Sequence, residues 1–464
     1  MNTQDTICAI ATAQGGAIGV IRISGKDAIA ITDRIFTPVG KHPLPLSERK
    51  AYTMAFGHIC QDDGEIIDEV LIGLFKSPHS YTGEDCVEIS CHGSSFILQQ
   101  VMQLLIRKGC RAAGPGEFTQ RAFLNGKMDL SQAEAVADLI ASSSAATHRM
   151  AMNQMRGGFS HELSALRERL LHLTSLMELE LDFSDHEELE FADRSELETI
   201  AGDIEKVISG LVHSFSVGNV LKNGIPVAIV GETNAGKSTL LNTLLNEEKA
   251  IVSDIHGTTR DVIEDTVNLS GITFRFIDTA GIRDTHDTIE NMGIARSFHK
   301  MEQAEIVLWV VDNTCAEAQI RQLSPRILPL CFNKQLIILL NKSDQVSAVP
   351  TKLSGLPENT VTLSISAKEK TGIQELQNLL VKTASVPELT SSDLIVTNVR
   401  HYEALSLALE DIHRVQNGLQ THLSGDLISQ DLRECLFHLA EIVGGEITAD
   451  EVLGNIFMKF CIGK

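Results

Sequence analysis

The sequence predicts a multidomain protein: an α+β N-terminal domain, an all-α helical domain, and an α/β domain with a phosphate-binding loop inserted into the helical one. Three observations lead to this fold class. Short alternating runs fill residues 1–125, apolar residues at helical spacing occur on both sides of the middle, and a GxxxxGKS string occupies residues 231–238. The length of 464 residues also exceeds one domain, and about three domains are expected.

Residues 1–126 are expected to form the α+β domain. Two strand-like runs, 19–24 and 86–91, are separated by turn signals such as residues 79–85. In the second run, the two-residue period of a strand places Glu88 on the same face as Cys86 and Ser90. That face is either an ordinary exposed sheet face or the lining of a pocket, and the residues by themselves favour the first.

Residues 127–218 and 385–464 are expected to be helical. The chain has no proline between Pro115 and Pro226, and none after Pro387. The segments 401–409 and 432–440 show the same three- and four-residue apolar steps as Leu163, Leu166, Leu170, Leu173, Met177 and Leu181. Because an inserted domain enters and leaves at neighbouring points, we expect one helical domain interrupted by residues 219–384. Two separate helical domains are the alternative.

The phosphate loop has the context that its chemistry requires. Residues 226–230 form a short apolar run before it, and residues 239–245 read as a helix after it. Backbone N–H groups and the helix N-terminus then bind the phosphates, Lys237 reaches the β- and γ-oxygens, and the Ser238 hydroxyl ligates Mg²⁺. The loop therefore predicts a nucleotide-binding domain.

Guanine is selected by Asn341, Lys342, Ser343 and Asp344, which follow the apolar run 335–340. The Asp344 carboxylate accepts hydrogen bonds from N1–H and the exocyclic amine of guanine. Adenine lacks this donor pair, so a buried charged acceptor would stay unpaired at a cost of about 1–3 kcal/mol or more. A simple polar turn is the competing interpretation, and the position behind a phosphate loop disfavours it. Ser366, Ala367 and Lys368 resemble the loop that supports the base in GTPases.

The switch elements lie between these motifs. Residues 278–281 match DxxG, in which Asp278 organises Mg²⁺ through water and the Gly281 amide meets the γ-phosphate. Residues 257–261 supply Thr259, which by resemblance is the second Mg²⁺ ligand. All five GTPase elements occur in order, so the sequence predicts GTP hydrolysis, with Lys237 and Asp278 among the catalytic residues.

The residue after DxxG departs from Ras-like enzymes, where a Gln orients the attacking water. Ile282 stands there and makes no hydrogen bond to water. Either hydrolysis is very slow or another residue positions the nucleophile. The downstream acids are Asp284, Asp287 and Glu290, and the local arginine-finger candidates are Arg260 and Arg283. For any one of these charges, a solvated loop face is the default interpretation.

Composition restricts the class further. No run reaches the roughly 18–20 apolar residues of a membrane span, and the first residues lack the layout of a signal peptide. Nine scattered cysteines are typical of reduced thiols in a cytoplasmic protein. A zinc site at Cys86, Cys91 and His92 is less favoured than core cysteines. The net charge of −22 disfavours a broadly basic nucleic-acid surface, while RNA binding through a local patch stays open.

Strings along nearly the whole chain resemble the MnmE (TrmE) family, GTPases that modify the wobble uridine of tRNA. They are residues 5–7, 19–25, 81–85, 115–130, 234–238 and 460–464. The last, Phe-Cys-Ile-Gly-Lys, is the most diagnostic. Its Cys461 is four residues from the end, but Gly463 and Lys464 do not suit a prenylation signal. Thr233 and Ser94 depart from a Pro and a Gly that are common in the family.

The resemblance implies an N-terminal domain that dimerises and binds a tetrahydrofolate one-carbon carrier, in the 5-formyl or methylene form, through Arg22, Glu88, Lys127 and Lys464. A carboxylate suits the amino edge of the pterin, and basic groups suit the anionic glutamate tail. The implied partner is the FAD-dependent protein MnmG (GidA). Together the two install an aminomethyl or carboxymethylaminomethyl group at C5 of the wobble uridine. Cys461 matches a cysteine that is important for activity.

For the GTPase domain, the resemblance implies K⁺ in the place of an arginine finger, with Glu290 positioning the water. The K⁺ ligands are Asn234, Ser253, Ile255 and Thr258. The nucleotide contacts are then Asn234, Ala235, Gly236, Lys237, Ser238, Thr239, Ser253, Asp254, Ile255, His256, Gly257, Thr258, Thr259, Asp278, Thr279, Ala280, Gly281, Asn341, Lys342, Asp344, Ser366, Ala367 and Lys368. The alternative function is a regulatory GTPase switch in ribosome assembly, which needs neither the folate residues nor the terminal string.

Overall fold

The structure of the protein is a computed structural model. It describes residues 5–13, 15–40, 43–182, 194–248, 265–277, 301–332, 334–346, 356–357, 360–384, 394–445 and 463. The chain divides into two compact units. The first comprises Met1–Ala141, Ala151–Val212 and Val399–Lys464, and the second comprises Ser142–Met150 and His213–Asn398. The domain boundaries expected within these units stay predictions.

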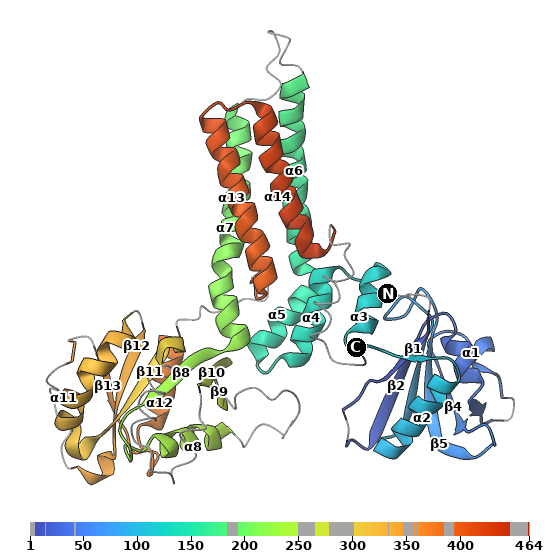
Figure 1. The fold of residues 1–464 in the computed structure, drawn as a ribbon, viewed down its shortest axis with the longest axis horizontal. Coiled ribbons are helices and arrows are strands. Elements are labelled where there is room, and N and C mark those ends of the chain that lie inside the picture. The colour runs from blue at the N-terminus through green and yellow to red at the C-terminus, as the bar shows by residue number, and fades with distance from the viewer. Residues whose placement is uncertain are drawn as a thin grey trace. The chain divides into compact units, whose positions relative to one another are not determined.

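The first unit begins with a seven-stranded sheet of order β3-β4-β5-β6-β2-β1-β7 (Figure 1). All neighbouring strands are antiparallel except β1 and β7. The strands are β1 Ile7–Ile10, β2 Ile18–Ser24, β3 Phe36–Pro38, β4 Thr53–Cys60, β5 Ile66–Phe75, β6 Cys86–His92 and β7 Arg111–Ala112. Helices α1 (Ala28–Asp33) and α2 (Ser95–Arg107), with the short 3₁₀ helix η1 (Leu46–Glu48), accompany them.

One face of this sheet packs into a core and the other is exposed. On β4 and β5 the burial alternates, so that Ala55, Val70 and Ile72 are buried while Phe56 and Leu71 are exposed. Leu98 and Val101 of α2 belong to the same apolar core as the buried strand residues. An antiparallel sheet covered on one side follows this period of two. On β6, Glu88 and Ser90 are half-buried and Cys86 is buried, so the ordinary exposed face that the sequence favoured for these three residues is wrong.

The rest of the first unit is helical, and two of its helices, α5 and α7, extend into the second unit. The helices are α3 Glu117–Leu124, α4 Leu130–Ala141, α5 Ala145–Met155, α6 Gly158–Asp182, α7 Arg194–Asn223, α13 Val399–Gln420 and α14 Gly425–Val443. In α6 the predicted apolar stripe is buried at Leu163, Leu166, Leu170, Leu173 and Met177, and the side chain of Leu181 lies outside the described residues. Helix α14 runs beside both α6 and α13 (Figure 1), and Glu205 of α7 lies 3.7 Å from His413 of α13.

The helices that follow the nucleotide-binding segment pack against those that precede it. Helix α14 lies along α6, and Arg433 pairs with Glu178 at 2.7 Å. The helical stretches on the two sides of the insertion therefore build one bundle, and the alternative of two separate helical domains is wrong. The physical reason is that each helix has an apolar stripe that it buries against the other.

A buried ion cluster joins three helices of this bundle. The Arg400 guanidinium on α13 binds both carboxylate oxygens of Glu134 on α4, at 3.0 and 2.9 Å. It also donates to the carbonyls of Glu441 and Ile442, at the end of α14, at 2.7 and 2.9 Å. The His401 Nε2 lies 2.6 Å from the Glu134 carboxylate. A single carboxylate thus connects α4 to α13, and through Arg400 to the C-terminus of α14.

The second unit contains a six-stranded sheet of order β13-β12-β11-β8-β10-β9, parallel except for β9. Its strands are β8 Ile225–Val230, β9 Asp265–Leu269, β10 Ile272–Phe276, β11 Ile306–Asp312, β12 Gln335–Asn341 and β13 Val361–Ser364. The helices are α8 Lys237–Glu248, α11 Ala316–Ile327 and α12 Ile373–Thr383, with 3₁₀ helices η2 Asn313–Cys315, η3 Leu328–Cys331 and η4 Ser343–Gln345.

Two apolar cores lie on opposite faces of this parallel sheet. Leu240 of α8 and Leu376 of α12 pack with Leu308 and Leu339 on one face. Ile320 of α11 packs with Trp309 and Ile338 on the other. A sheet covered on both faces explains the continuous apolar runs of β11 and β12. Ligands of such open α/β sheets bind at the carboxyl ends of the strands, where the predicted nucleotide motifs stand. Among the described helices, none combines the length and apolarity that crossing a membrane requires.

Candidate functional site

The phosphate loop connects β8 to α8, as predicted. Helix α8 begins at Lys237, so its first backbone N–H groups lie at the end of the loop. Gly236 has a φ of +98°, and a Cβ at this position would lie 2.1 Å from the Asn341 Nδ2. A side chain is excluded there on both counts. The loop therefore approaches the guanine motif so closely that only glycine fits.

Lys237 is tied to its own loop. Its Nζ donates to the carbonyls of Gly231 and Glu232 at 2.9 and 2.7 Å. Burial lowers the pKa of the Lys237 ammonium, and the nearby Glu232 carboxylate acts in the opposite direction. The Lys237 side chain thus folds back on the loop, and its ammonium contacts two backbone carbonyls there. A polyphosphate supplies the charge that the buried ammonium favours.

The guanine motif and the base-supporting loop meet the phosphate loop through Asn341. Its Nδ2 donates to the Ala235 carbonyl at 2.8 Å, and its Oδ1 accepts from the Ala367 N–H at 3.0 Å. The Ser366 hydroxyl donates to the Asp344 carboxylate at 2.6 Å. Lys368 is exposed beside this loop. The structure therefore brings together the two loops predicted to bind guanine, and joins them to the phosphate loop.

Asp312 belongs to this site, and the sequence analysis did not predict it. Its carboxylate lies 2.5 Å from the Nζ of Lys342, a residue with a left-handed backbone and a φ of +64°. Burial alone would raise the pKa of Asp312, but hydrogen bonds from Lys342 and Thr314 outweigh it and lower the pKa. A signal existed, because Asp312 ends the apolar run 306–311 of a strand that neighbours both β8 and β12.

The switch segments and the chain end carry the remaining predicted nucleotide and activity residues. These predictions lie outside the described residues, and they stay predictions: Ser253, Asp254, Ile255, His256, Gly257, Thr258, Thr259, Asp278, Thr279, Ala280, Gly281, Arg283, Glu290, Cys461 and Lys464.

A second candidate site lies on the N-terminal sheet. Arg22 of β2 is directly opposite Glu88 of β6, and its Nε donates to the Glu88 carboxylate at 2.9 Å. The guanidinium also lies 5.5 Å from the ring centroid of Tyr81 and 5.8 Å from that of Phe118. Both partners of the ion pair remain partly exposed, at 20% and 32% of the side-chain surface. This pair is a charged group beside aromatic faces, open to solvent.

The end of the chain reaches the same site. The Arg22 Nη1 donates to the Gly463 carbonyl at 3.3 Å. Gly463 has a φ of +97°, and a Cβ there would lie 2.5 Å from the Ile10 carbonyl oxygen on β1. Backbone packs on backbone at this point, which requires glycine. Sequence reasoning placed the terminal string at this site by resemblance, and the contact of Gly463 with Arg22 was not foreseen.

Lys127, the third predicted folate residue, contacts the loop between β5 and β6 instead of the Arg22 pair. Its Nζ donates to the Pro78 carbonyl at 3.0 Å. Asn125 holds the same loop through a bond from its Nδ2 to the Thr82 carbonyl at 2.7 Å. Residues that follow α3 therefore hold the loop that carries Tyr81 by hydrogen bonds to its carbonyls.

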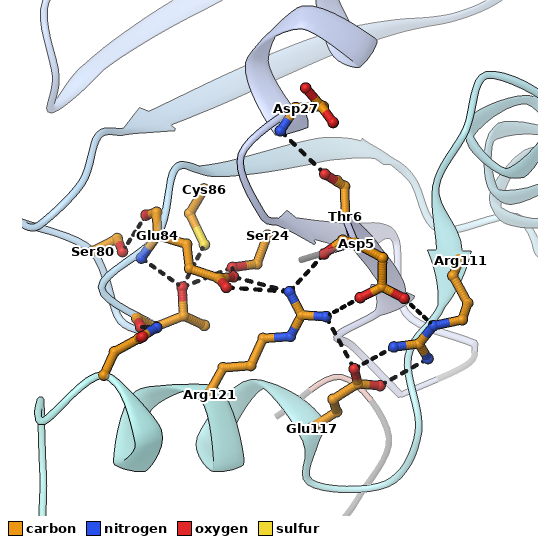
Figure 2. A network of polar contacts seen from close by, with 12 residues as sticks. Asp5, Thr6, Ser24, Asp27, Ser80, Glu84, Cys86, Arg111, Glu117 and Arg121 are labelled. Carbon is orange, nitrogen blue, oxygen red and sulfur yellow. Dashed lines mark hydrogen bonds and ion pairs between the residues drawn. The ribbon is translucent and has the colours of Figure 1, made fainter. Parts of the chain in front are cut away.

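A charged network supports this part of the site (Figure 2). The buried Arg121 of α3 points into a ring of acceptors, with Nη2 2.7 Å from Asp5 and 3.2 Å from Glu117, and Nη1 3.2 Å from Glu84. Arg111 binds Asp5 and Glu117 from the other side, at 2.6 and 2.5 Å. Burial would raise the pKa of Glu117, but Arg111 and the Gly114 N–H lower it overall. The network joins the segment before β1, strand β7, helix α3 and the loop after β5.

The fold and the first site define the class. A doubly wound parallel sheet with a phosphate loop after β8, a guanine motif after β12 and a supporting loop after β13 is that of a P-loop GTPase.

Comparison with known proteins identifies the family. The model of the MnmE helical domain matches residues 130–461, and that of the GTP-binding protein TrmE N-terminus matches residues 6–127. The chain is 66% identical to the tRNA modification GTPase MnmE of Bacteroides thetaiotaomicron, over 99% of this chain and 100% of that protein. It is 64% identical to that of Parabacteroides distasonis over 99% and 100%. The chain belongs to the MnmE family of tRNA modification GTPases.

Two more distant proteins, one curated relative and one solved structure, also resemble this chain. The tRNA modification GTPase MnmE of Flavobacterium johnsoniae is 52% identical over the full length of both chains. Among solved structures, Era in complex with MgGDPNP and a 16S ribosomal RNA segment is 30% identical over 40% of this chain and 66% of that chain, with a TM-score of 0.27. That likeness is too slight to support an argument about function.

Proposed function

We propose that the protein is the GTP-hydrolysing subunit of a cytoplasmic tRNA-modifying complex. It adds an aminomethyl or carboxymethylaminomethyl group to C5 of the wobble uridine of tRNA, with a one-carbon unit from tetrahydrofolate. The observation that carries the proposal is the contact of the chain end with Arg22, because it builds a second site in a chain that already has a guanine nucleotide site. A GTPase switch alone needs no such site.

The folate part of the proposal is supported by the chemistry around Arg22. The Glu88 carboxylate offers two acceptors for the amino edge of a pterin, and the Tyr81 and Phe118 rings offer flat apolar faces for its ring system. Lys127 and Lys464 would bind the anionic glutamate tail. When bound, the folate supplies the one-carbon unit, while the residues of this chain orient it and shield it from water.

The exposed face of the N-terminal sheet supports a homodimer. Phe56 and Leu71 are directly opposite each other on β4 and β5, and they are 49% and 37% exposed. Met54 on the same face is 62% exposed. Exposed neighbouring apolar side chains of this kind mark interaction surfaces. We assign the face to a second copy of this chain, as the family resemblance implies.

The nucleotide part of the proposal is supported by the phosphate loop and by the family resemblance. GTP would bind with Mg²⁺ held by Ser238 and Thr259, and Lys237 would move from the loop carbonyls to the phosphates. Asn234, Ser253, Ile255 and Thr258 would hold K⁺, and Glu290 would position the water. The hydrolysis cycle would drive the modification together with the FAD-dependent partner MnmG (GidA). Mg²⁺ and K⁺ would stabilise the charge that develops on the phosphates.

The potassium assignment has its own test. GTP turnover is expected to be faster in K⁺ than in Na⁺ at equal ionic strength, because the chain has Ile282 where Ras-like enzymes have Gln. The Asn234→Ala variant is expected to lose this difference. Equal rates in the two salts for the unmodified protein would contradict the assignment.

The modification itself is tested by mass spectrometry of tRNA nucleosides. Cells that lack the protein are expected to lose the aminomethyl-type modification at uridine C5. The intact chain should restore it, and the Asp278→Ala variant should not. A titration with tetrahydrofolate, with Lys127→Ala as the comparison, tests the folate site directly. An unchanged nucleoside profile would favour the regulatory switch in ribosome assembly instead.

A further inference from the structure

The phosphate loop carries an acidic residue at its second position. Glu232 follows Gly231 directly, and its own backbone carbonyl accepts the Lys237 ammonium at 2.7 Å. A loop that binds a polyphosphate gains nothing from a carboxylate, because like charges repel across the short distances within a loop. The position of this carboxylate therefore matters for the affinity of the site.

A glutamine on a neighbouring helix holds that carboxylate. The Gln319 Nε2, on α11, donates to the Glu232 Oε2 at 2.8 Å. The Gln319 Oε1 accepts the backbone N–H of Asp312 at 2.9 Å. Gln319 is buried, at 7% exposure. A carboxamide is the side chain that donates to a carboxylate and accepts from an N–H at the same time, so both ends of Gln319 are used.

The contacts continue to the guanine motif. The Asp312 carboxylate binds the Lys342 ammonium at 2.5 Å and accepts two bonds from Thr314, from its N–H at 3.0 Å and its hydroxyl at 2.7 Å. A polar chain thus runs from Glu232 through Gln319 and Asp312 to Lys342. It links the phosphate loop to the guanine motif along α11, separately from the Asn341 bond to Ala235.

We propose that Gln319 is a positioning residue for GTP binding: it keeps the Glu232 carboxylate against α11, away from the phosphates, and couples the phosphate loop to Lys342. The proposal rests on the GTP binding proposed above. GTP carries one more negative charge than GDP, so release of the carboxylate should weaken GTP binding more than GDP binding. Gln319 thereby adjusts the preference between the two nucleotides.

The test is a set of nucleotide titrations on the full-length protein, with fluorescent GDP and a fluorescent non-hydrolysable GTP analogue. Gln319→Glu places a second carboxylate against Glu232 and should weaken binding of the GTP analogue about tenfold, the size of one charge-assisted hydrogen bond. GDP should be affected less. Gln322→Glu is the matched control, because Gln322 is an exposed glutamine on the same helix.

The exchanged pair separates positioning from charge. In Gln319→Glu combined with Glu232→Gln, the new carboxylate accepts from both the new carboxamide and the Asp312 N–H, and the net charge is unchanged. We expect the nucleotide affinities to return to within about twofold of the original values. Gln319→Met, which removes both bonds without adding charge, should weaken the GTP analogue more than GDP and is the second variant if Gln319→Glu does not fold.

Two results would overturn the inference. One is that Gln319→Met and Gln319→Glu bind the GTP analogue as tightly as the control variant Gln322→Glu does. The other is an exchanged pair as weak as Gln319→Glu alone. Failure of the unmodified protein to bind either nucleotide would count against the proposed GTPase function, so the two failures are distinguishable.

Discussion

Replacement of Glu134 by Gln is expected to destabilise the packing of α4 against α13 and α14. The Glu134 carboxyl is buried, which by itself raises its pKa, but His401 and Arg400 lower the pKa to about 2, against an ordinary value of 4.5. This preference for the ionised form corresponds to about 3 kcal/mol. The amide of Gln has no charge, so the variant removes the ion pairs that the Glu134 carboxylate makes with Arg400 and His401.

The direction of the pH dependence follows from the lowered pKa. The stabilisation by Glu134 is complete above pH 4.5, where the carboxyl is ionised in the folded and the unfolded protein alike. It is lost as the pH falls through about 2, where the folded form takes up its proton. The variant and the original protein should therefore differ by about 3 kcal/mol at neutral pH and converge in strong acid.

Amide hydrogen exchange is the suitable assay, because a multidomain chain does not unfold in one step. At pH 7, amides of α4 and α13 in Glu134→Gln should exchange about 100-fold faster, which corresponds to about 3 kcal/mol in local opening. Glu168→Gln, at an exposed position on α6, is the matched control and should leave exchange unchanged. Equal protection of α4 and α13 in all three proteins would refute the reasoning.

Three further substitutions test the rest of the structure. Arg121→Met removes the buried cation that Asp5, Glu84 and Glu117 share, and leaves Arg111 on Asp5 and Glu117; it should destabilise the N-terminal sheet by about 3–5 kcal/mol, measured by urea unfolding of that region. Gly236→Ala should abolish guanine nucleotide binding in a fluorescence titration while circular dichroism stays unchanged, because the added carbon collides with Asn341. Gly463→Ala should displace the chain end from β1 and weaken tetrahydrofolate binding about tenfold, and an unchanged affinity would remove the chain end from that site.

Local patterns in the sequence were sufficient for much of the fold. The apolar run before residue 231 is β8, the run before Asn341 is β12, and the leucine stripe from Leu163 is the buried face of α6. Each of these signals depends on neighbours within a few residues, either a strand or helix period or a motif between two elements. The nucleotide class and the order of the site elements could therefore be predicted before any contact was known.

The contacts that complete the sites depend on tertiary structure. Arg22 and Gly463 are 441 positions apart, Arg400 and Glu134 are 266 apart, and Gln319 and Glu232 are 87 apart. No period or motif relates such pairs, because the chain between them does not determine which side chains meet. The sequence by itself determined the nucleotide, the type of each domain and the family. Only the tertiary packing decided which polar side chains pair with one another, since an ion pair or hydrogen bond forms between atoms that the fold brings within about 3 Å.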